Sequence, residues 1–398
     1  MLVRFAWRVA LLLGALVSVA GAAGPLPDVE RFGGDASGGG FAQVLEPRVF
    51  EFPRDHGAHP QYRQEWWYVT GNLDSATGER FGFELTIFRF ALAPERVVPT
   101  LATASPGLVA PAAALSAAGS SAVESSWRTG QIYMGHFAIT DVARKQFRFT
   151  QKLSRGAVGL AGARNPPLQV WIDDWSLGTV DPEGTHWRLR AAESGYELTL
   201  DAEALQQPVL NGDKGLSQKS SDRGSASYYY SIPRVAVHGR LVRDRVPVDV
   251  KGLAWVDREW GSGALGGNEQ GWDWFALQLQ DGRSLMFYAL RNHDGQRDPH
   301  SAGTWIGASG ESRALSSDQV QIDVLDYWKN PGGDRYPAHW RVRIPTEGID
   351  VDVRPVLPNQ ELTASARYWE GAVDVTGASG GQKTVGRGYV ELVGYAAQ

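Results

Sequence analysis

The sequence predicts an all-β protein made of two related units. Segments that alternate apolar and polar residues recur along the 398-residue chain, and none of them keeps a helical apolar period. In the second half, turn signals recur about every 8–12 residues, as in a barrel or sandwich. The 15 Trp, 13 Tyr, 14 Phe and 47 Gly favour strands and turns over helices.

An internal repeat points to the two units. The segment EWWYVTGNL (65–73) aligns without a gap with GWDWFALQL (271–279). A second strand follows in each copy, at 80–90 and at 283–291, and in the later copy the two are joined by Gln280-Asp281-Gly282. Asp-Gly between alternating apolar runs is a strong hairpin signal. The repeat therefore indicates two tandem β units rather than one large sheet, the alternative being chance similarity of two aromatic-rich hairpins.

The amino-terminal residues 1–22 match a secretory signal peptide. Arg4 and Arg8 form its basic region, Val9 to Ala20 its apolar core, and Ala20-Gly21-Ala22 a small-residue cleavage site. At about 1.5 Å per residue this core is too short to cross roughly 30 Å of hydrocarbon comfortably, although an uncleaved anchor is the alternative. We expect cleavage near Ala22 and a periplasmic or secreted mature protein without a membrane span.

Composition and missing motifs exclude several function classes. The chain has no cysteine, hence no disulfide, thiolate metal site or thiol nucleophile. Its net charge is −5, and we find no concentrated basic patch, so nucleic acid is not an expected partner. No histidine pair has zinc spacing, no GxSxG elbow occurs, and GSGALGG (261–267) lacks the helix and lysine of a phosphate loop. We therefore expect neither a metal nor a cofactor.

The sequence also predicts a leader, an insertion, a domain boundary and the strands. Residues 23–43 are a flexible leader, and 99–123, rich in Ala and without charges, is a disordered insertion or a lid over a cavity mouth. We place the domain boundary at the turn 243–245, which gives an N-terminal domain 44–243 and a C-terminal domain 244–398. The predicted strands are 65–73, 81–92, 131–141, 146–153, 168–180, 185–193, 196–205, 227–242, 246–260, 272–279, 283–291, 304–310, 319–329, 339–345, 349–357, 367–377 and 385–395.

Four motifs in this order resemble the AttH/CrtC family of secreted lipocalin-like proteins: EWWYVTGNL (65–73), YMGHFAITD (133–141), AWVDREWG (254–261) and GWDWFALQL (271–279). The family includes the carotenoid 1,2-hydratases. The resemblance implies two tandem lipocalin-like antiparallel β-barrel domains and an extended apolar ligand, such as a lipid or an isoprenoid. It also implies hydro-lyase chemistry, the addition of water to an isoprenoid double bond without a cofactor. Other members are often encoded beside ABC-transporter permeases, which makes such a permease an expected partner.

Asp257 is the candidate catalytic residue. The resemblance places the essential aspartate of the hydratases at Asp257, and aromatic residues of their site near Trp255, Tyr228 and Tyr230. Strand alternation puts Trp255, Asp257 and Glu259 on one face. A carboxylic acid beside indole surface is desolvated, which raises its pKa. Such an acid could protonate an alkene, and its conjugate base could then direct water to the cation.

Other interpretations of the same residues remain open. Asp257 could form a structural ion pair with Arg258 or Arg240. Asp257 and Glu259 could instead be the two carboxylates of a glycoside hydrolase. The protein could also be a non-catalytic carrier of an apolar ligand, or an accessory protein of an ABC-type export system.

His136, Trp66 and Trp272 complete the candidates. His136 is either a polar anchor in the ligand cavity or a buried, hydrogen-bonded histidine. Trp66 and Trp272 are expected to close the bottom of the barrels by packing against Arg89 and Arg291. In this interpretation, each barrel encloses an apolar ligand in its own interior.

Overall fold

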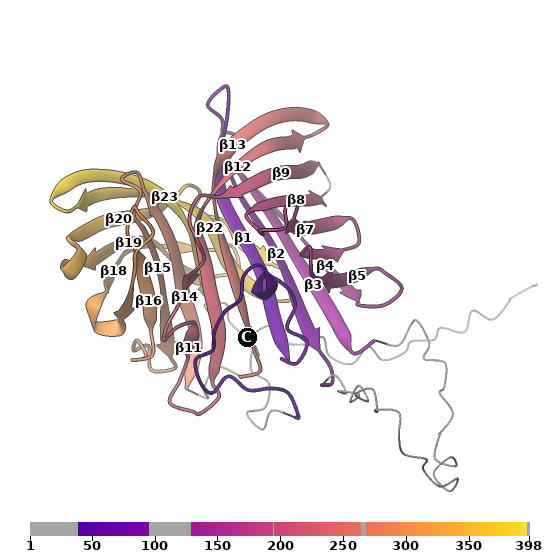
Figure 1. Cartoon of the computed structure of the whole chain (residues 1–398). Coiled ribbons are helices and arrows are strands. Elements are labelled where there is room, and N and C mark those ends of the chain that lie inside the picture. The colour runs from indigo at the N-terminus through magenta and orange to yellow at the C-terminus, as the bar shows by residue number, and fades with distance from the viewer. Residues whose placement is uncertain (1–38, 95–128, 194, 264–267, 396–398) are drawn as a thin grey trace, which may run out of the picture.

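A computed structural model describes residues 39–94, 129–193, 195–263 and 268–395, which form two antiparallel β-sheets (Figure 1). Three short 3-10 turns are described beside the strands: η2 (Arg54–His56), η4 (Ser317–Gln319) and η5 (Pro345–Glu347). The expected signal peptide, most of the leader and the insertion at 99–123 lie outside these residues. Over the described ranges, no helix has the length and apolar character needed to cross a membrane.

The first sheet is curled into a barrel-like unit. Its strand order is β4-β3-β2-β1-β13-β12-β9-β8-β7-β6-β5, with β10 and β11 paired to β12. Near the far end of this order β6 contacts β3 and β4, which brings the two ends of the sheet together. The strands are β1 (Gln64–Ser75), β2 (Arg80–Ala91), β3 (Gln131–Asp141), β4 (Gln146–Arg155), β5 (Ala161–Arg164), β6 (Gln169–Ile172), β7 (Trp175–Thr179), β8 (His186–Glu193), β9 (Tyr196–Ala204), β10 (Val209–Leu210), β11 (Leu216–Gln218), β12 (Ala226–Arg243) and β13 (Val246–Gly261).

The second sheet repeats this plan. Its order is β17-β16-β15-β14-β23-β22-β20-β19-β18, with β21 paired to β22. In both sheets the first strand pairs with the second and with the last, β1 with β13 and β14 with β23, so the predicted all-β fold with two tandem barrel-like units is confirmed. The strands are β14 (Glu269–Leu279), β15 (Ser284–Asn292), β16 (Ala302–Ile306), β17 (Ser312–Ser316), β18 (Gln321–Lys329), β19 (Arg335–Ile344), β20 (Ile349–Pro355), β21 (Glu361–Thr363), β22 (Arg367–Ser379) and β23 (Gln382–Val393).

The chain passes from one sheet to the other later than the sequence suggested. The expected boundary at 243/244 falls in the turn between β12 and β13, and both of these strands belong to the first sheet. Asp244 and Arg245 have φ values of 50° and 69°, the left-handed geometry of a tight hairpin turn. A hairpin joins strands of the same sheet, so the change of sheet comes between Gly261 and Glu269.

The interiors of both units are filled by their own side chains. In the first unit the largest are Trp67, Trp175 and Trp260, each at 0% exposure. Trp340 and Trp369 fill the interior of the second unit in the same way. The expectation that each barrel holds a ligand in its interior is therefore wrong, because aromatic rings occupy that volume.

A third apolar cluster lies between the two units. It joins outward-facing side chains of the first sheet, such as Tyr68, Tyr229 and Trp255, with Trp274 and Tyr288 of the second. Figure 1 shows the strands concerned side by side in the middle of the molecule, and β1 contacts β23 while β12 contacts β14. The central strands thus bury both faces, one in a barrel and one against the other unit.

Candidate functional site

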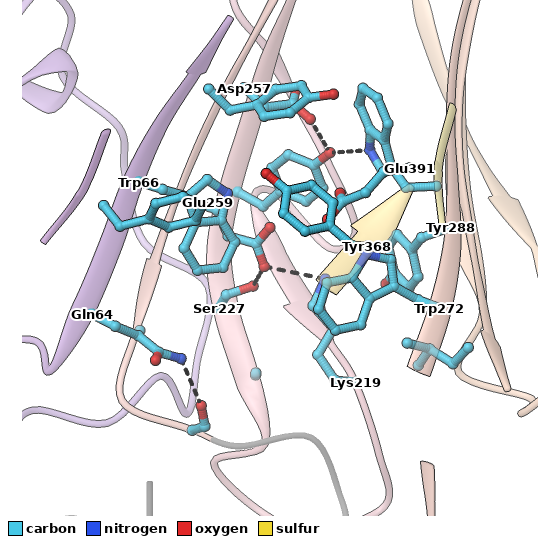
Figure 2. A pocket seen from close by; sticks show the side chains of 18 of the residues that line it. Gln64, Trp66, Lys219, Ser227, Asp257, Glu259, Trp272, Tyr288, Tyr368 and Glu391 are labelled. Atoms are coloured by element: carbon cyan, nitrogen blue, oxygen red, sulfur yellow. Dashed lines mark hydrogen bonds and ion pairs between the residues drawn. The ribbon is translucent and has the colours of Figure 1, made fainter. Parts of the chain in front are cut away.

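A cavity of about 130 Å³ lies between the two sheets. It is lined by β1, β2, β12 and β13 on one side and by β14, β15, β22 and β23 on the other (Figure 2). An apolar lining with a few converging polar groups is typical of a small-molecule site. Its aromatic residues are Trp66, Tyr68, Phe88, Tyr229, Trp272, Trp274, Tyr288 and Tyr368, and its charged types are Glu84, Asp257, Glu259, Glu370, Glu391 and Lys219.

Asp257 lies in this cavity and is held by neutral donors. On β13 it lies opposite Tyr68 of β1 and Ser231 of β12. Its carboxyl accepts hydrogen bonds from the Tyr229 hydroxyl at 2.5 Å, the Ser231 hydroxyl at 2.6 Å and the Trp255 indole at 2.7 Å. The side chain is 4% exposed. A buried carboxyl group therefore faces an aromatic cavity in a fixed orientation.

The ion-pair interpretation of Asp257 is wrong. Arg258, the next residue on the strand, points into the barrel and lies 3.0 Å from Glu65, while Arg240 lies 3.4 Å from Asp249 at the surface. No cation of the described residues lies at bonding distance, and burial raises the pKa of Asp257 to about 7, against the lowering effect of its three hydrogen bonds. The acid form is consequently present near neutral pH.

Both units contribute to the surroundings of Asp257. The indole of Trp274, on β14, donates to the Tyr229 hydroxyl at 3.0 Å, and this hydroxyl donates in turn to Asp257. Figure 2 marks hydrogen bonds beside Asp257 with dashed lines. The second sheet thereby fixes the position of Tyr229 from across the cavity.

Glu259 faces the same cavity but has different partners from those of Asp257. Lys219 lies 3.2 Å from its Oε1, and the Ser227 hydroxyl also donates to it (Figure 2). The lysine ammonium lies 4.0 Å from the ring centroid of Tyr288, a cation–π distance. Of these two carboxyls of β13, Glu259 has a cation partner, whereas Asp257 has none within the described ranges, so Asp257 is the one suited to donate a proton.

Two predicted ligand contacts lie elsewhere. Tyr228 and Tyr230 point into the first barrel, where their hydroxyls bond to the Glu46 carbonyl at 2.8 Å and to Nδ1 of His56 at 2.6 Å. The residue between them, Tyr229, lines the cavity instead. Successive side chains on a strand point to opposite faces, so a one-residue error selects the wrong face.

His136 lies behind the cavity wall. Its Nδ1 is 2.6 Å from the hydroxyl of Tyr368, which lines the cavity, and the imidazole is at 0% exposure. Burial lowers the pKa of His136 to about 4, so the ring is neutral at neutral pH. The residue is a buried, hydrogen-bonded histidine that reaches the cavity only through Tyr368.

Trp66 and Trp272 line the cavity rather than the bottom of a barrel. The arginines expected to pack on them have acidic partners: Arg89 pairs with Glu65, and Arg291 lies 2.9 Å from Asp273. The repeat thus supplies one tryptophan from each unit to a shared cavity.

Three further cavity carboxyls, Glu84, Glu370 and Glu391, were not predicted. For Glu391 a signal existed: YVE (389–391) corresponds to WVD (255–257), and Glu391 lies opposite Trp274 as Asp257 lies opposite Tyr68. Glu84 was visible as a charged residue between the apolar positions of β2. Burial raises the pKa of Glu84 to about 7 and that of Glu391 to about 8, and it holds that of Glu370 well above its usual range.

The raised pKa values of the cavity carboxyls predict an unusual dependence of stability on pH. Their pKa values are higher in the folded than in the unfolded chain, so the folded state keeps protons that the unfolded chain loses above about pH 4. We expect the free energy of unfolding to fall from pH 5 to pH 8, by up to about 1.4 kcal/mol per pH unit for each group. Urea unfolding at both pH values measures it, and Glu391→Gln should show a smaller fall than the unmodified chain. A stability that is flat or rises over this range would contradict the assignment.

Comparisons with known proteins agree with this geometry. The model of a family described as AttH-like matches residues 43–395. The crystal structure of an AttH protein from Nitrosomonas europaea is 33% identical with a TM-score of 0.74, and the match covers 89% of this chain and 100% of that one. No curated protein matches the sequence.

Two more distant structures share the fold. Kievitone hydratase from Nectria haematococca is 14% identical with a TM-score of 0.63, over 90% of this chain and 97% of that one. CghA, in a structure with Sch210972, is 12% identical with a TM-score of 0.51, over 92% and 98%. The family match over nearly all of the described chain and the close structural relative lead to one conclusion: the protein belongs to the AttH-like family.

Proposed function

We propose that the cavity between the two sheets binds an apolar, isoprenoid-like ligand and that Asp257 catalyses the cofactor-free addition of water to its carbon–carbon double bond. One observation carries the proposal: a buried carboxyl group, without a cation partner in the described part of the chain, faces an aromatic cavity, and burial raises its pKa to about 7. The similarity of the fold to a protein named kievitone hydratase supports the same reaction class.

The proposed reaction uses Asp257 twice. The acid gives its proton to one alkene carbon, and the π electrons of the alkene form the new C–H bond, which leaves a cation on the other carbon. The faces of Tyr68 and Trp274, which line the cavity, can stabilise that cation. The carboxylate then takes a proton from a water molecule as the water oxygen bonds to the cation. In sum, one water molecule is added to the double bond, and the acid form of Asp257 is restored.

The size of the cavity limits which part of the ligand reacts inside it. A volume of about 130 Å³ is close to the roughly 150 Å³ of a cavity that holds benzene. A ring or a branched terminus fits there, and the rest of a long isoprenoid has to extend outside. We further propose that the protein acts in the periplasm or after secretion, because residues 1–22 match a signal peptide, and that its partner is an ABC-type permease.

The test is a search for hydration of branched isoprenoid alkenes in water enriched with heavy oxygen. We expect products that carry one heavy oxygen, detected by mass spectrometry. The rate should be highest below pH 7 and should fall about tenfold per pH unit above it, because only the protonated form of Asp257 can donate. Binding of the alkenes without any hydration at pH 6 would instead favour a non-catalytic carrier.

A further inference from the structure

Two other carboxyl groups line the cavity, and each has a buried oxygen without a hydrogen-bond partner among the described residues. Glu84 on β2 and Glu370 on β22 both line it, and each is 1% exposed. Oε1 of Glu84 accepts hydrogen bonds from Thr86 at 2.9 Å and Tyr368 at 3.1 Å, and Oε1 of Glu370 accepts one from Tyr68 at 2.7 Å. Oε2 of each is buried and has no hydrogen-bond partner among the described residues. Both acids therefore have one satisfied and one unsatisfied oxygen.

The proton of each acid belongs on the unsatisfied oxygen. Burial raises the pKa of Glu84 to about 7 and holds that of Glu370 well above its usual range, so Glu84 is mostly protonated at pH 6 and the acid form of Glu370 is favoured. Since hydroxyl donors occupy Oε1, the proton resides on Oε2, which becomes an O–H donor without an acceptor. Buried donors normally have partners, so two of them at one cavity indicate a group that is supplied from outside the chain.

We infer that Glu84 and Glu370 form a polar subsite that binds a carbonyl oxygen of the ligand. A carbonyl oxygen has two lone pairs and can accept from both acids. The inference rests on the proposed function, since it takes the cavity as the ligand site. It narrows the substrate class to apolar molecules that carry a carbonyl group in addition to the alkene.

The nearby groups favour a neutral acceptor over a cation. To bind an ammonium group, Glu84 and Glu370 would have to ionise beside each other and beside Glu391, and like charges oppose this. Lys219, the one lysine among the lining residues that the structure describes, is held by Glu259. The other titratable groups that act on the pair, from β1, β3, β22 and β23, are Tyr68, His136, Tyr368, Tyr389 and Glu391.

Three probes of similar shape test the subsite: acetophenone with a carbonyl, ethylbenzene with none, and benzylamine with a cation. Dissociation constants come from ligand-observed NMR titrations of the full chain at pH 6. We expect acetophenone to bind at least about tenfold more tightly than either of the others. In the double variant Glu84→Met, Glu370→Met this preference should shrink to about twofold or less, with ethylbenzene binding retained.

The matched double variant Glu84→Gln, Glu370→Gln keeps an N–H donor in place of each acid, so its preference for acetophenone should persist. The unmodified chain should lose part of that preference between pH 6 and pH 9 as Glu84, with a pKa of about 7, ionises, whereas the Gln variant should keep it. This comparison applies even if the Met variant does not fold, which thermal melting shows.

The outcomes separate the two proposals. Equal binding of acetophenone and ethylbenzene by the unmodified chain would overturn the carbonyl subsite and leave the apolar cavity site standing. Tightest binding of benzylamine would overturn it in favour of a cation site. If none of the probes binds, the cavity is not a ligand site and the proposed function fails as well.

Discussion

Asp257→Asn is expected to lower the hydration rate by about 10²–10⁴-fold. The amide has nearly the same shape as the carboxyl and can still bond to Ser231, Trp255 and Tyr229, but it has no acidic proton to give to an alkene. The measurement is the initial rate of product formation at pH 6, together with the dissociation constant of the alkene. Binding should remain within about threefold, because the aromatic walls of the cavity are unchanged.

Asp249→Asn is the matched control for this experiment. It makes the same change on the same strand, but Asp249 is 82% exposed and pairs with the surface residue Arg240. Its rate should equal that of the unmodified chain. If Asp257→Asn keeps the full rate, Asp257 is not the proton donor and the proposed mechanism is wrong; if it loses binding together with the rate, its role is to hold the ligand.

Glu65→Gln is expected to lower the free energy of unfolding by about 3–5 kcal/mol. Glu65 is fully buried between Arg89 and Arg258, and it also accepts a hydrogen bond from the backbone N–H of His59 at 3.1 Å. These charges hold the pKa of Glu65 well below its usual range. A neutral amide would leave two buried guanidinium groups without a counter-charge. Chemical denaturation at pH 6 measures the loss.

Glu51→Gln provides the control for stability. Glu51 lies 2.7 Å from Arg54, but the two side chains are 59% and 73% exposed. Exposed pairs contribute at most about 1 kcal/mol, so this variant should unfold close to the unmodified chain. Similar losses in both variants would mean that the buried pair is not an important source of stability.

Strand alternation predicted one part of the site and left another part open. From the sequence, Trp255, Asp257 and Glu259 share one face of a strand, and the structure places them together between the sheets. Alternation also separates Tyr229 from Tyr228 and Tyr230, yet it does not say which of the two faces is functional. Both faces of β12 are aromatic, so composition could not make that choice.

The sequence did not predict Glu84 and Glu370 as site residues, for a related reason. They belong to different units, and only the docking of one sheet on the other brings them to the same cavity. In the sequence each is one of three charged residues in its strand, and alternation alone does not say which of them is buried. A charged residue of a strand can equally point into solvent, as Glu197 of β9 shows by its exposed side chain.

The sequence by itself determined the strands, the internal repeat, the family resemblance and the face of β13 that carries Asp257, because a side-chain period of two and a turn signal are local properties of the chain. Only the tertiary structure decided that the barrels are solid and that the cavity lies between them. The central strands are apolar on both faces, and a sequence does not show which face packs inward and which meets the partner unit. That choice depends on contacts between the two units, such as the hydrogen bond from Tyr68 to Glu370, 302 positions apart, which form only when the two sheets pack together.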